Sequence, residues 1–258
     1  MNGNGPFSIA ALWVHPRSMS TAIERIMRER GDLFCFHEPF MYYYYLGLGK
    51  RKLPHSDLDI GNPTTFAGIV RELEEKAKYG RVFFKDMSYY VLPEIFRYPQ
   101  LANRMDHLIL IRNPRKSILS YYKLDPGIPR NEVGLEAQWV LYQWLEENSG
   151  CAPFVLEAER VQQDPVQSMT RVWSYLGLDM KPEAFEWGEE SIPADWRSVS
   201  GWHRDAMAST GIRQQVAEDE RAVEQRFEEA ARKSPRLWEL LEYHLPFYEK
   251  LKARSGCG

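Results

Sequence analysis

The fold of this chain is decided by a stretch near its N-terminus, Ile9-Ala10-Ala11-Leu12-Trp13-Val14-His15-Pro16-Arg17-Ser18-Met19-Ser20-Thr21. The apolar first half is typical of a strand buried on both faces, which predicts a strand over residues 8–14. Apolar side chains at helical spacing follow from Thr21 to Arg30, and Gly31 is a suitable helix end. The polar run 15–21 therefore joins a strand to a helix. Its hydroxyls, its guanidinium and the backbone N–H groups of the helix start suit a phosphate, although an ordinary Ser/Thr helix cap is the alternative.

Short apolar runs and helical patterns alternate along the following sequence. The patterns predict further strands at 33–36, 81–84, 107–111 and 154–156, and helices at 64–78, 131–148, 165–176, 218–232 and 235–244. In the first helix the solvent face is expected to carry the charged residues Glu24, Arg25, Arg28 and Glu29. This alternation predicts an α/β fold, a three-layer sandwich in which a parallel central sheet has helices on both faces and a P-loop-like phosphate-binding loop after its first strand. We expect one domain over residues 1–258, with a core at about 8–180 and a helical C-terminal portion at about 181–258.

Composition and charge narrow the class of protein. The 258 residues carry 33 Lys and Arg against 36 Asp and Glu, a net charge of −3, which argues against a generally basic nucleic-acid binder. Long apolar runs are lacking in the sequence, so no membrane association is expected, and the start of the chain does not resemble a secretory signal. The three Cys and six His lack metal-ligand spacing, which predicts a cytoplasmic protein that needs no metal.

A second anion-binding segment follows the fourth expected strand. Arg112 stands at the strand end, Asn113 can cap the next helix, and Pro114 suits its first position. Ser120 lies on the second helical turn, so Arg112 and Ser120 can converge on one anion. A solvated basic helix start is the alternative. Two such segments at neighbouring strand ends favour a ligand with two separate phosphates.

These two segments resemble the signature motifs of the sulfotransferases that use 3′-phosphoadenosine 5′-phosphosulfate (PAPS). The first motif, of Pro-Lys/Arg-Ser-x-Ser/Thr-Thr type, matches residues 16–21, and the second matches Arg112, Asn113, Pro114 and Ser120. The resemblance covers roughly residues 8–180 and is closest to a group of small bacterial enzymes. It implies PAPS as the sulfuryl donor and adenosine 3′,5′-bisphosphate (PAP) as a product.

The resemblance also implies a role for each matched residue. The 5′-phosphate would be held by the backbone amides of 17–21 and by Ser18, Ser20 and Thr21, while Arg17 would neutralise the oxygen that bridges phosphorus and sulfur. Arg112 and Ser120 would hold the 3′-phosphate, with Arg204 as a weaker candidate in a closing basic loop. Met19 replaces the Gly that is common in this motif, which predicts a loop backbone without a positive φ at that position.

Sulfuryl transfer also needs help for the leaving phosphate and a base for the acceptor proton. Lys85, at the end of the third strand, is the predicted partner of Arg17 in the first task, and a surface lysine is the alternative. Where the phenol- and steroid-sulfating relatives have a catalytic His, this chain has Met87, so their base does not transfer. Glu38 is the best candidate base, with Asp86 and His37 behind it. Glu38 as a helix-start carboxylate or a structural ion pair is the alternative.

An aromatic run at residues 40–46 follows Glu38 directly, and Glu38, Phe40 and Tyr42 are the predicted acceptor contacts. The core face of a helix or a self-association surface explains the run equally well, so a homodimer stays among the alternatives. The resulting hypothesis is a PAPS-dependent transfer to a hydroxyl or amine of a small-molecule or carbohydrate acceptor. A nucleotide-dependent kinase and a non-catalytic PAP-binding protein are the rival functions, although the sequence lacks the Walker Lys-Ser/Thr motif of a kinase.

Overall fold

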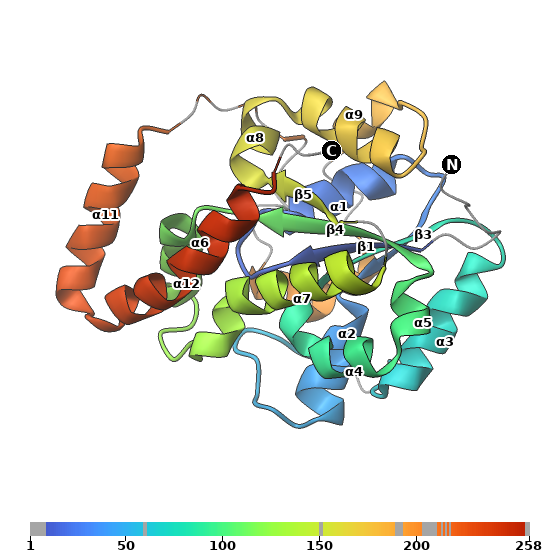
Figure 1. Ribbon diagram of the computed structural model, residues 1–258, viewed down its shortest axis with the longest axis horizontal. Helices are drawn as coiled ribbons and strands as arrows, with labels where there is room; N and C mark the ends of the chain where they lie inside the picture. The colour runs from blue at the N-terminus through green and yellow to red at the C-terminus, as the bar shows by residue number, and fades with distance from the viewer. Residues whose placement is uncertain are drawn as a thin grey trace.

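A parallel sheet of five strands forms the centre of the protein (Figure 1). The computed structural model describes residues 9–58, 61–149, 152–188, 193–202, 211–212, 214, 216 and 218–255. The strand order is β2-β3-β1-β4-β5, and every pairing in the sheet is parallel. The strands are β1 (Ile9–Val14), β2 (Phe34–His37), β3 (Val82–Met87), β4 (Met105–Ile111) and β5 (Phe154–Glu157). The predicted α/β fold with a parallel sheet is confirmed.

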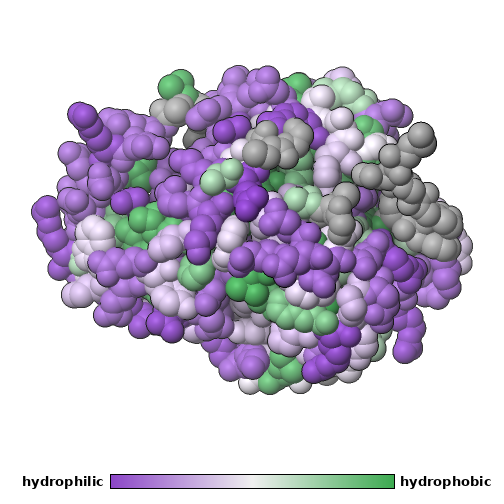
Figure 2. Space-filling view, viewed as in Figure 1, coloured by the Kyte–Doolittle hydropathy of each residue, from purple (hydrophilic) through white to green (hydrophobic). Residues whose placement is uncertain are grey.

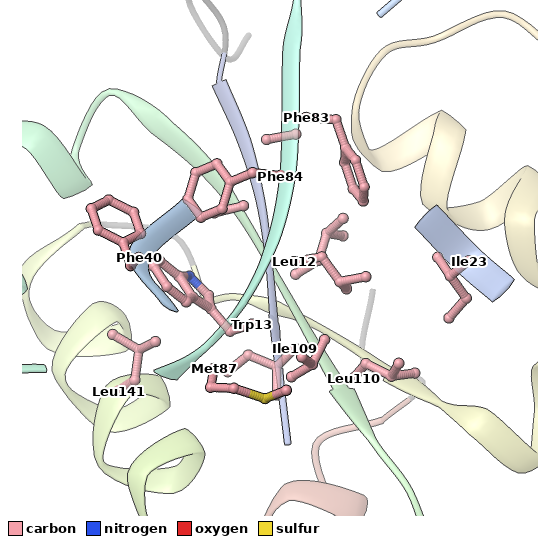
Figure 3. Close-up of a cluster of buried hydrophobic side chains, with 14 of the residues drawn as sticks. Leu12, Trp13, Ile23, Phe40, Phe83, Phe84, Met87, Ile109, Leu110 and Leu141 are labelled. Carbon is pink, nitrogen blue, oxygen red and sulfur yellow. The ribbon is translucent and has the colours of Figure 1, made fainter. Parts of the chain in front are cut away.

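The central strand β1 is buried along its whole length, as its apolar sequence predicts. Successive side chains of a strand point to opposite faces. Figure 3 shows the result: Leu12 lies with Phe83 and Ile23 on one side of the sheet, and Trp13 lies with Phe84 and Phe40 on the other. The sheet therefore has a hydrophobic core on both faces.

Helices cover both faces of the sheet (Figure 1). One face carries α1 (Ser20–Glu29), α8 (Ala158–Gln163) and α9 (Pro165–Tyr175), and the other carries α2 (Pro39–Tyr42), α3 (Phe66–Ala77), α4 (Leu92–Arg97) and α7 (Leu135–Asn148). The other α-helices of the described residues are α5 (Pro99–Ala102), α6 (Pro114–Tyr122), α11 (Glu220–Lys233) and α12 (Arg236–Lys252). Short helical turns are η1 (Tyr43–Gly47), η2 (Ser88–Tyr90), η3 (Arg130–Val133), η4 (Pro182–Phe185) and η5 (Ala194–Trp202).

Two predicted helix caps are present. The side chains of Asn113 and Asp164 accept hydrogen bonds from the backbone N–H groups of Arg115 and Gln167 at the starts of α6 and α9. The predicted helix 131–148 is wrong in its first turn, because Gly134 adopts φ 87° and separates η3 from α7. A Cβ atom at Gly134 would stand 3.1 Å from that of His15, so the break also lets the chain pass close to the loop after β1.

The C-terminal part of the chain packs on the sheet. The final helix α12 passes through Pro246 and runs to Lys252, beyond the predicted end at His244, and it contacts α7, β4 and β5. A proline inside a helix removes one backbone hydrogen bond, but buried side chains on both sides of it, such as Leu241 and Leu251, hold the helix together. Helix α8 was not predicted, since it follows β5 directly and is short.

The face of the molecule seen in Figure 2 is mostly hydrophilic, with hydrophobic areas that are small and scattered. Among the described residues, no helix combines the length and the apolar character needed to cross a membrane. The apolar residues of the chain are thus used mainly in the two cores beside the sheet.

Candidate active site

The predicted site residues lie where strands end at one edge of the sheet. The loop 15–19 follows β1, Glu38 follows β2, Lys85 lies near the end of β3, and Arg112 follows β4. Because these strands are parallel and adjacent, their carboxyl ends meet at one edge. This is the edge where ligands bind in open α/β sheets.

The loop predicted to bind a phosphate has two residues in the left-handed region. Arg17 has φ 63° and Met19 has φ 70°. The expectation that Met19 would avoid positive φ is therefore wrong: Met19 adopts a backbone conformation that favours Gly, at a cost of about 1–3 kcal/mol. This conformation gives a tight turn into α1, which begins at Ser20.

The hydroxyl groups of this loop face inward. Ser18, Ser20 and Thr21 are all buried at the start of α1. The Oγ atom of Ser18 has no hydrogen-bond partner among the described residues. A buried hydroxyl without a partner costs free energy, so this atom is poised for a ligand that supplies one.

The two segments that are predicted to bind anions contact each other. Arg17 donates from Nε to Oγ of Ser120 over 2.9 Å, and Arg112 donates from Nη1 to the carbonyl oxygen of Arg17 over 2.7 Å. The Nε atom of Arg112 is buried without a partner among the described residues. Burial lowers the pKa of Arg112, against the attraction of Glu159 and Glu218. The structure thus brings together Arg17, Arg112 and Ser120, three residues distant in sequence.

His15 ties the two segments to each other, and the sequence analysis missed it. Its Nε2 atom accepts a hydrogen bond from the backbone N–H of Arg112 over 3.1 Å. Burial, together with the charge of Arg112, lowers the pKa of His15 to about 3, so the ring is neutral and can accept. The feature of the sequence that could have identified His15 is its position directly after a fully buried strand.

Lys85 and Glu38 form a buried ion pair. The distance from Lys85 Nζ to Glu38 Oε1 is 2.5 Å, and the side chains are 0% and 7% exposed. The alternative that Lys85 is a surface lysine is therefore wrong. Glu38 adopts φ 45° at the N-cap position of α2, so the helix-start and ion-pair interpretations both describe its geometry. A close pair of opposite charges shielded from water can stabilise changing charge far better than an exposed pair.

Behind this pair lies a second carboxylate, Glu24 of α1. Its Oε2 atom stands 3.8 Å from Lys85 Nζ and 2.7 Å from His37 Nδ1. Its Oε1 atom accepts from Arg28 Nε over 2.8 Å and from Trp196 Nε1 over 2.9 Å. The prediction that Glu24 and Arg25 face solvent is wrong, since both are buried. Turn η5 covers the side of α1 that carries Glu24, and no local sequence pattern in the helix predicts this contact.

Asp86 and Phe40 occupy different surroundings. Alternation along β3 turns Asp86 away from Lys85, and its carboxylate accepts from the backbone N–H groups of Phe40 over 2.6 Å and of Met87 over 2.9 Å. Burial, and next the charge of Glu38, raises the pKa of Asp86 well above its ordinary value. Phe40 packs in the core against Phe66 and Phe84, and Tyr42 is also buried, so the core interpretation holds for this part of the aromatic run. Arg204 lies outside the described residues.

Two tyrosines in the rest of the aromatic run contact a partly buried ion pair. Tyr44 and Tyr45 each donate a hydroxyl hydrogen bond of 3.4 Å to the carboxylate of Glu132, which also binds Arg51. Trp202 lies beside Tyr121, and its carbonyl oxygen accepts a hydrogen bond from Arg17 Nη1. The sequence analysis missed Arg51, Glu132 and Trp202, because their partners are remote in sequence.

Solved structures with the same fold are sulfotransferase domains. The domain from the curacin biosynthetic pathway matches with a TM-score of 0.58 at 16% identity, over 87% of this chain and 96% of that one. The domain from the olefin synthase of Synechococcus PCC 7002 matches with a TM-score of 0.53 at 17% identity, over 90% of this chain and 97% of that one. At such identities the likeness concerns the fold.

Two curated relatives come from Arabidopsis thaliana, branched-chain-amino-acid aminotransferase-like proteins 1 and 2. Each is 25% identical, over 93% and 78% of this chain and over 41% and 35% of those proteins. The chain therefore spans less than half the length of these relatives. A sequence model of the sulfotransferase domain matches residues 8–255. This match spans nearly the whole sequence, and the chain accordingly belongs to the sulfotransferase domain family.

Proposed function

We propose that this protein transfers a sulfuryl group from PAPS to a hydroxyl or amine of a small-molecule or carbohydrate acceptor. The observation that carries the proposal is the convergence of Arg17, Arg112 and Ser120, with hydrogen bonds of 2.9 and 2.7 Å, at the carboxyl edge of the sheet. A donor with phosphates at its 5′ and 3′ positions needs two such anion sites close together. A cytoplasmic location and a reaction without metal are parts of the same proposal.

The residues present fit this donor. The orphaned Ser18 Oγ and Arg112 Nε are buried polar groups that a phosphate would satisfy. Ser18, Ser20, Thr21 and the amides at the start of α1 would hold the 5′-phosphate, where the helix dipole also favours an anion. Arg112 and Ser120 would hold the 3′-phosphate. The proposed contribution of Arg204 stays a prediction.

The buried pair of Lys85 and Glu38 would perform the two chemical tasks. Lys85, together with Arg17, would stabilise the charge that develops on the leaving phosphate. Glu38 would take the proton of the acceptor, a task that requires its carboxylate within about 3 Å of the acceptor or one bridging water. Asp86 is less suited as the base, because two backbone N–H groups already occupy its oxygens.

Ligand binding followed by a transfer assay tests this function. PAP at 100 times its dissociation constant should stabilise the protein by about 2.7 kcal/mol in thermal unfolding, and ATP with Mg²⁺ should stabilise it much less. Incubation with PAPS and a panel of hydroxyl and amine acceptors should give a sulfated product and PAP. Equal stabilisation by ATP would favour the kinase. Tight PAP binding without product from any acceptor would favour the non-catalytic binding protein.

A further inference from the structure

The strands β1 and β4, which precede the two segments predicted to bind anions, stop pairing with each other before they end. Their pairing ends at Trp13 and Ile109. Strand β1 nevertheless continues to Val14, paired with β3, and β4 continues to Ile111, paired with β5. After β1 the chain enters α1 on one face of the sheet, whereas after β4 it leads through α6 to α7 on the other face (Figure 1). Ligands of open α/β sheets bind where neighbouring connections leave to opposite faces in this way.

The side chain of Gln138, from α7, joins the two strands beyond the end of their pairing. Its Nε2 group donates to the carbonyl oxygen of Trp13 over 3.0 Å and to that of Leu110 over 2.9 Å. Gln138 is fully buried. Because both partners are acceptors, the nitrogen of the amide must face the strands. One side-chain amide thus replaces the backbone pairing that has ended between β1 and β4.

His15 makes a second connection between the same strands. Its Nε2 atom accepts a hydrogen bond from the backbone N–H of Arg112 over 3.1 Å. A backbone N–H that lies beyond the last pair of the ladder, at Ile109, needs another acceptor, and the imidazole supplies it. The ring is buried and neutral. Since Nε2 accepts, the proton of His15 is on Nδ1.

The first turn of α7 fixes the position of both side chains. Gly134 precedes the helix so close to His15 that a Cβ atom at Gly134 would stand 3.1 Å from that of His15. Gln138 follows one turn later, and its backbone N–H donates to the carbonyl oxygen of Gly134 over 3.0 Å. Residues four apart lie on the same face of a helix, so the break at Gly134 brings Gln138 against the strand ends.

We propose that Gln138 and His15 form a polar bridge that sets the spacing of the two segments predicted to bind anions, and that both are positioning residues for donor binding. The inference rests on the proposed function. His15 acts through Arg112: it fixes the backbone N–H of this residue, whose side chain then reaches the carbonyl oxygen of Arg17 over 2.7 Å. The polar bridge has this effect without touching the donor.

The first test compares His15→Gln with His15→Phe. The Gln carbonyl oxygen can take the place of Nε2 and accept from Arg112, whereas Phe fills the space of the ring and cannot accept. We expect His15→Phe to raise the dissociation constant of PAP about five- to thirtyfold in calorimetry, and His15→Gln to stay within about threefold of the wild type. The control is His107→Phe, which removes a buried ring that accepts from Trp13 Nε1; it should lower stability but change PAP affinity by less than about twofold.

A double variant tests whether His15 acts through Arg112. Once Arg112→Ala has removed the guanidinium group, His15→Phe has no side chain left to misplace. It should then raise the dissociation constant of PAP by less than about twofold. A further five- to thirtyfold loss, about that of the single variant, would show independent contributions and would overturn the role of His15 as a residue that positions Arg112.

The second test is Gln138→Met, with Gln143→Met on the exposed side of the same helix as the matched control. Met keeps the length of the side chain but removes both donors, so the carbonyl oxygens of Trp13 and Leu110 lose this partner. We expect Gln138→Met to raise the dissociation constant of PAP about five- to thirtyfold. Gln143→Met should leave it within about twofold of the wild type.

Nitrogen-15 NMR tests the polar bridge without any ligand. The wild type should show an Nδ1–H imidazole for His15. It should also show a scalar coupling across the hydrogen bond between Nε2 of His15 and the amide nitrogen of Arg112. An Nε2–H imidazole, or no such coupling, would overturn the inference whatever the affinity for PAP.

The outcomes separate this inference from the proposed function. A wild type that binds no PAP overturns the proposed function and, with it, a role in donor binding. If the wild type binds PAP, the polar bridge alone is overturned when His15→Phe binds as well as His15→Gln, or when Gln138→Met binds as well as Gln143→Met. If His15→Phe or Gln138→Met does not fold, the other variant and the wild-type spectrum still decide.

Discussion

Substituting Lys85 by Met removes the cation that lies between the buried carboxylates of Glu38 and Glu24 at the candidate site. Met keeps the length of the aliphatic chain, so packing changes little while the charge is lost. Glu38 Oε1, 2.5 Å from Nζ in the wild type, is left without this partner, and the 3.8 Å attraction to Glu24 Oε2 is lost too. We expect Lys85→Met to lower the free energy of unfolding by about 3–5 kcal/mol, as for other buried pairs that lose one partner.

Substituting the other partner of the pair, Glu38, should lower the free energy of unfolding by less, because the two partners have different surroundings. In Glu38→Gln the ammonium group keeps Glu24 at 3.8 Å and can still donate to the Gln oxygen. We expect a loss of about 1–3 kcal/mol, that of a weakened buried hydrogen bond. The double variant Lys85→Met with Glu38→Gln should be more stable than Lys85→Met alone, because no carboxylate is then left unpaired.

Urea denaturation with linear extrapolation measures these three free energies. Lys78→Met is the control, since Lys78 forms an ion pair with Glu75 on the surface and its removal should leave the midpoint unchanged. The reasoning is refuted if Glu38→Gln costs as much as Lys85→Met. It is also refuted if the double variant loses the sum of the two single losses.

Three further outcomes are expected. Arg112→Ala should weaken the binding of PAP by about 2–4 kcal/mol but barely change that of adenosine 5′-phosphosulfate, and equal losses in calorimetry would make Arg112 structural. Glu38→Gln should lower turnover about 10²–10⁴-fold and leave the affinity for PAP unchanged. Asp86→Asn should lower the free energy of unfolding by about 1–3 kcal/mol and leave turnover unchanged. The reverse pattern of turnover would identify Asp86 as the base. Burial lowers the pKa of His15, His107 and His244 to about 3, 4 and 4, so these three side chains bind fewer protons in the folded chain than in the unfolded chain below pH 6.5. Stability should therefore fall with falling pH, by up to about 1.4 kcal/mol per pH unit for each His, and denaturation curves of equal midpoint at pH 7 and 5 would contradict this.

The sheet could be predicted from the sequence because its signals are local. An apolar run such as Ile9–Val14 identifies a buried strand without reference to the rest of the chain, and the caps Asn113 and Asp164 identify helix starts in the same way. The order of strands and the parallel pairing then bring the two loops that are predicted to bind anions to one edge. The predicted helix boundaries are wrong where tertiary contacts decide them. Gly134 breaks a predicted helix beside His15, and Pro246 does not break α12.

The buried charged residues around Lys85 show why the deeper part of the site could not be predicted in the same way. Glu24 stands in a helix beside Arg25 and Arg28, and that pattern alone predicts a solvated face. Its burial depends on η5, about 170 residues further on, which supplies Trp196 as a hydrogen-bond donor to the same carboxylate. A buried anion is tolerated only where cations and donors surround it, and here they come from α1, β2, β3 and η5. The pairing of Glu38 likewise exists only in that assembly, because its partner Lys85 comes from a different strand.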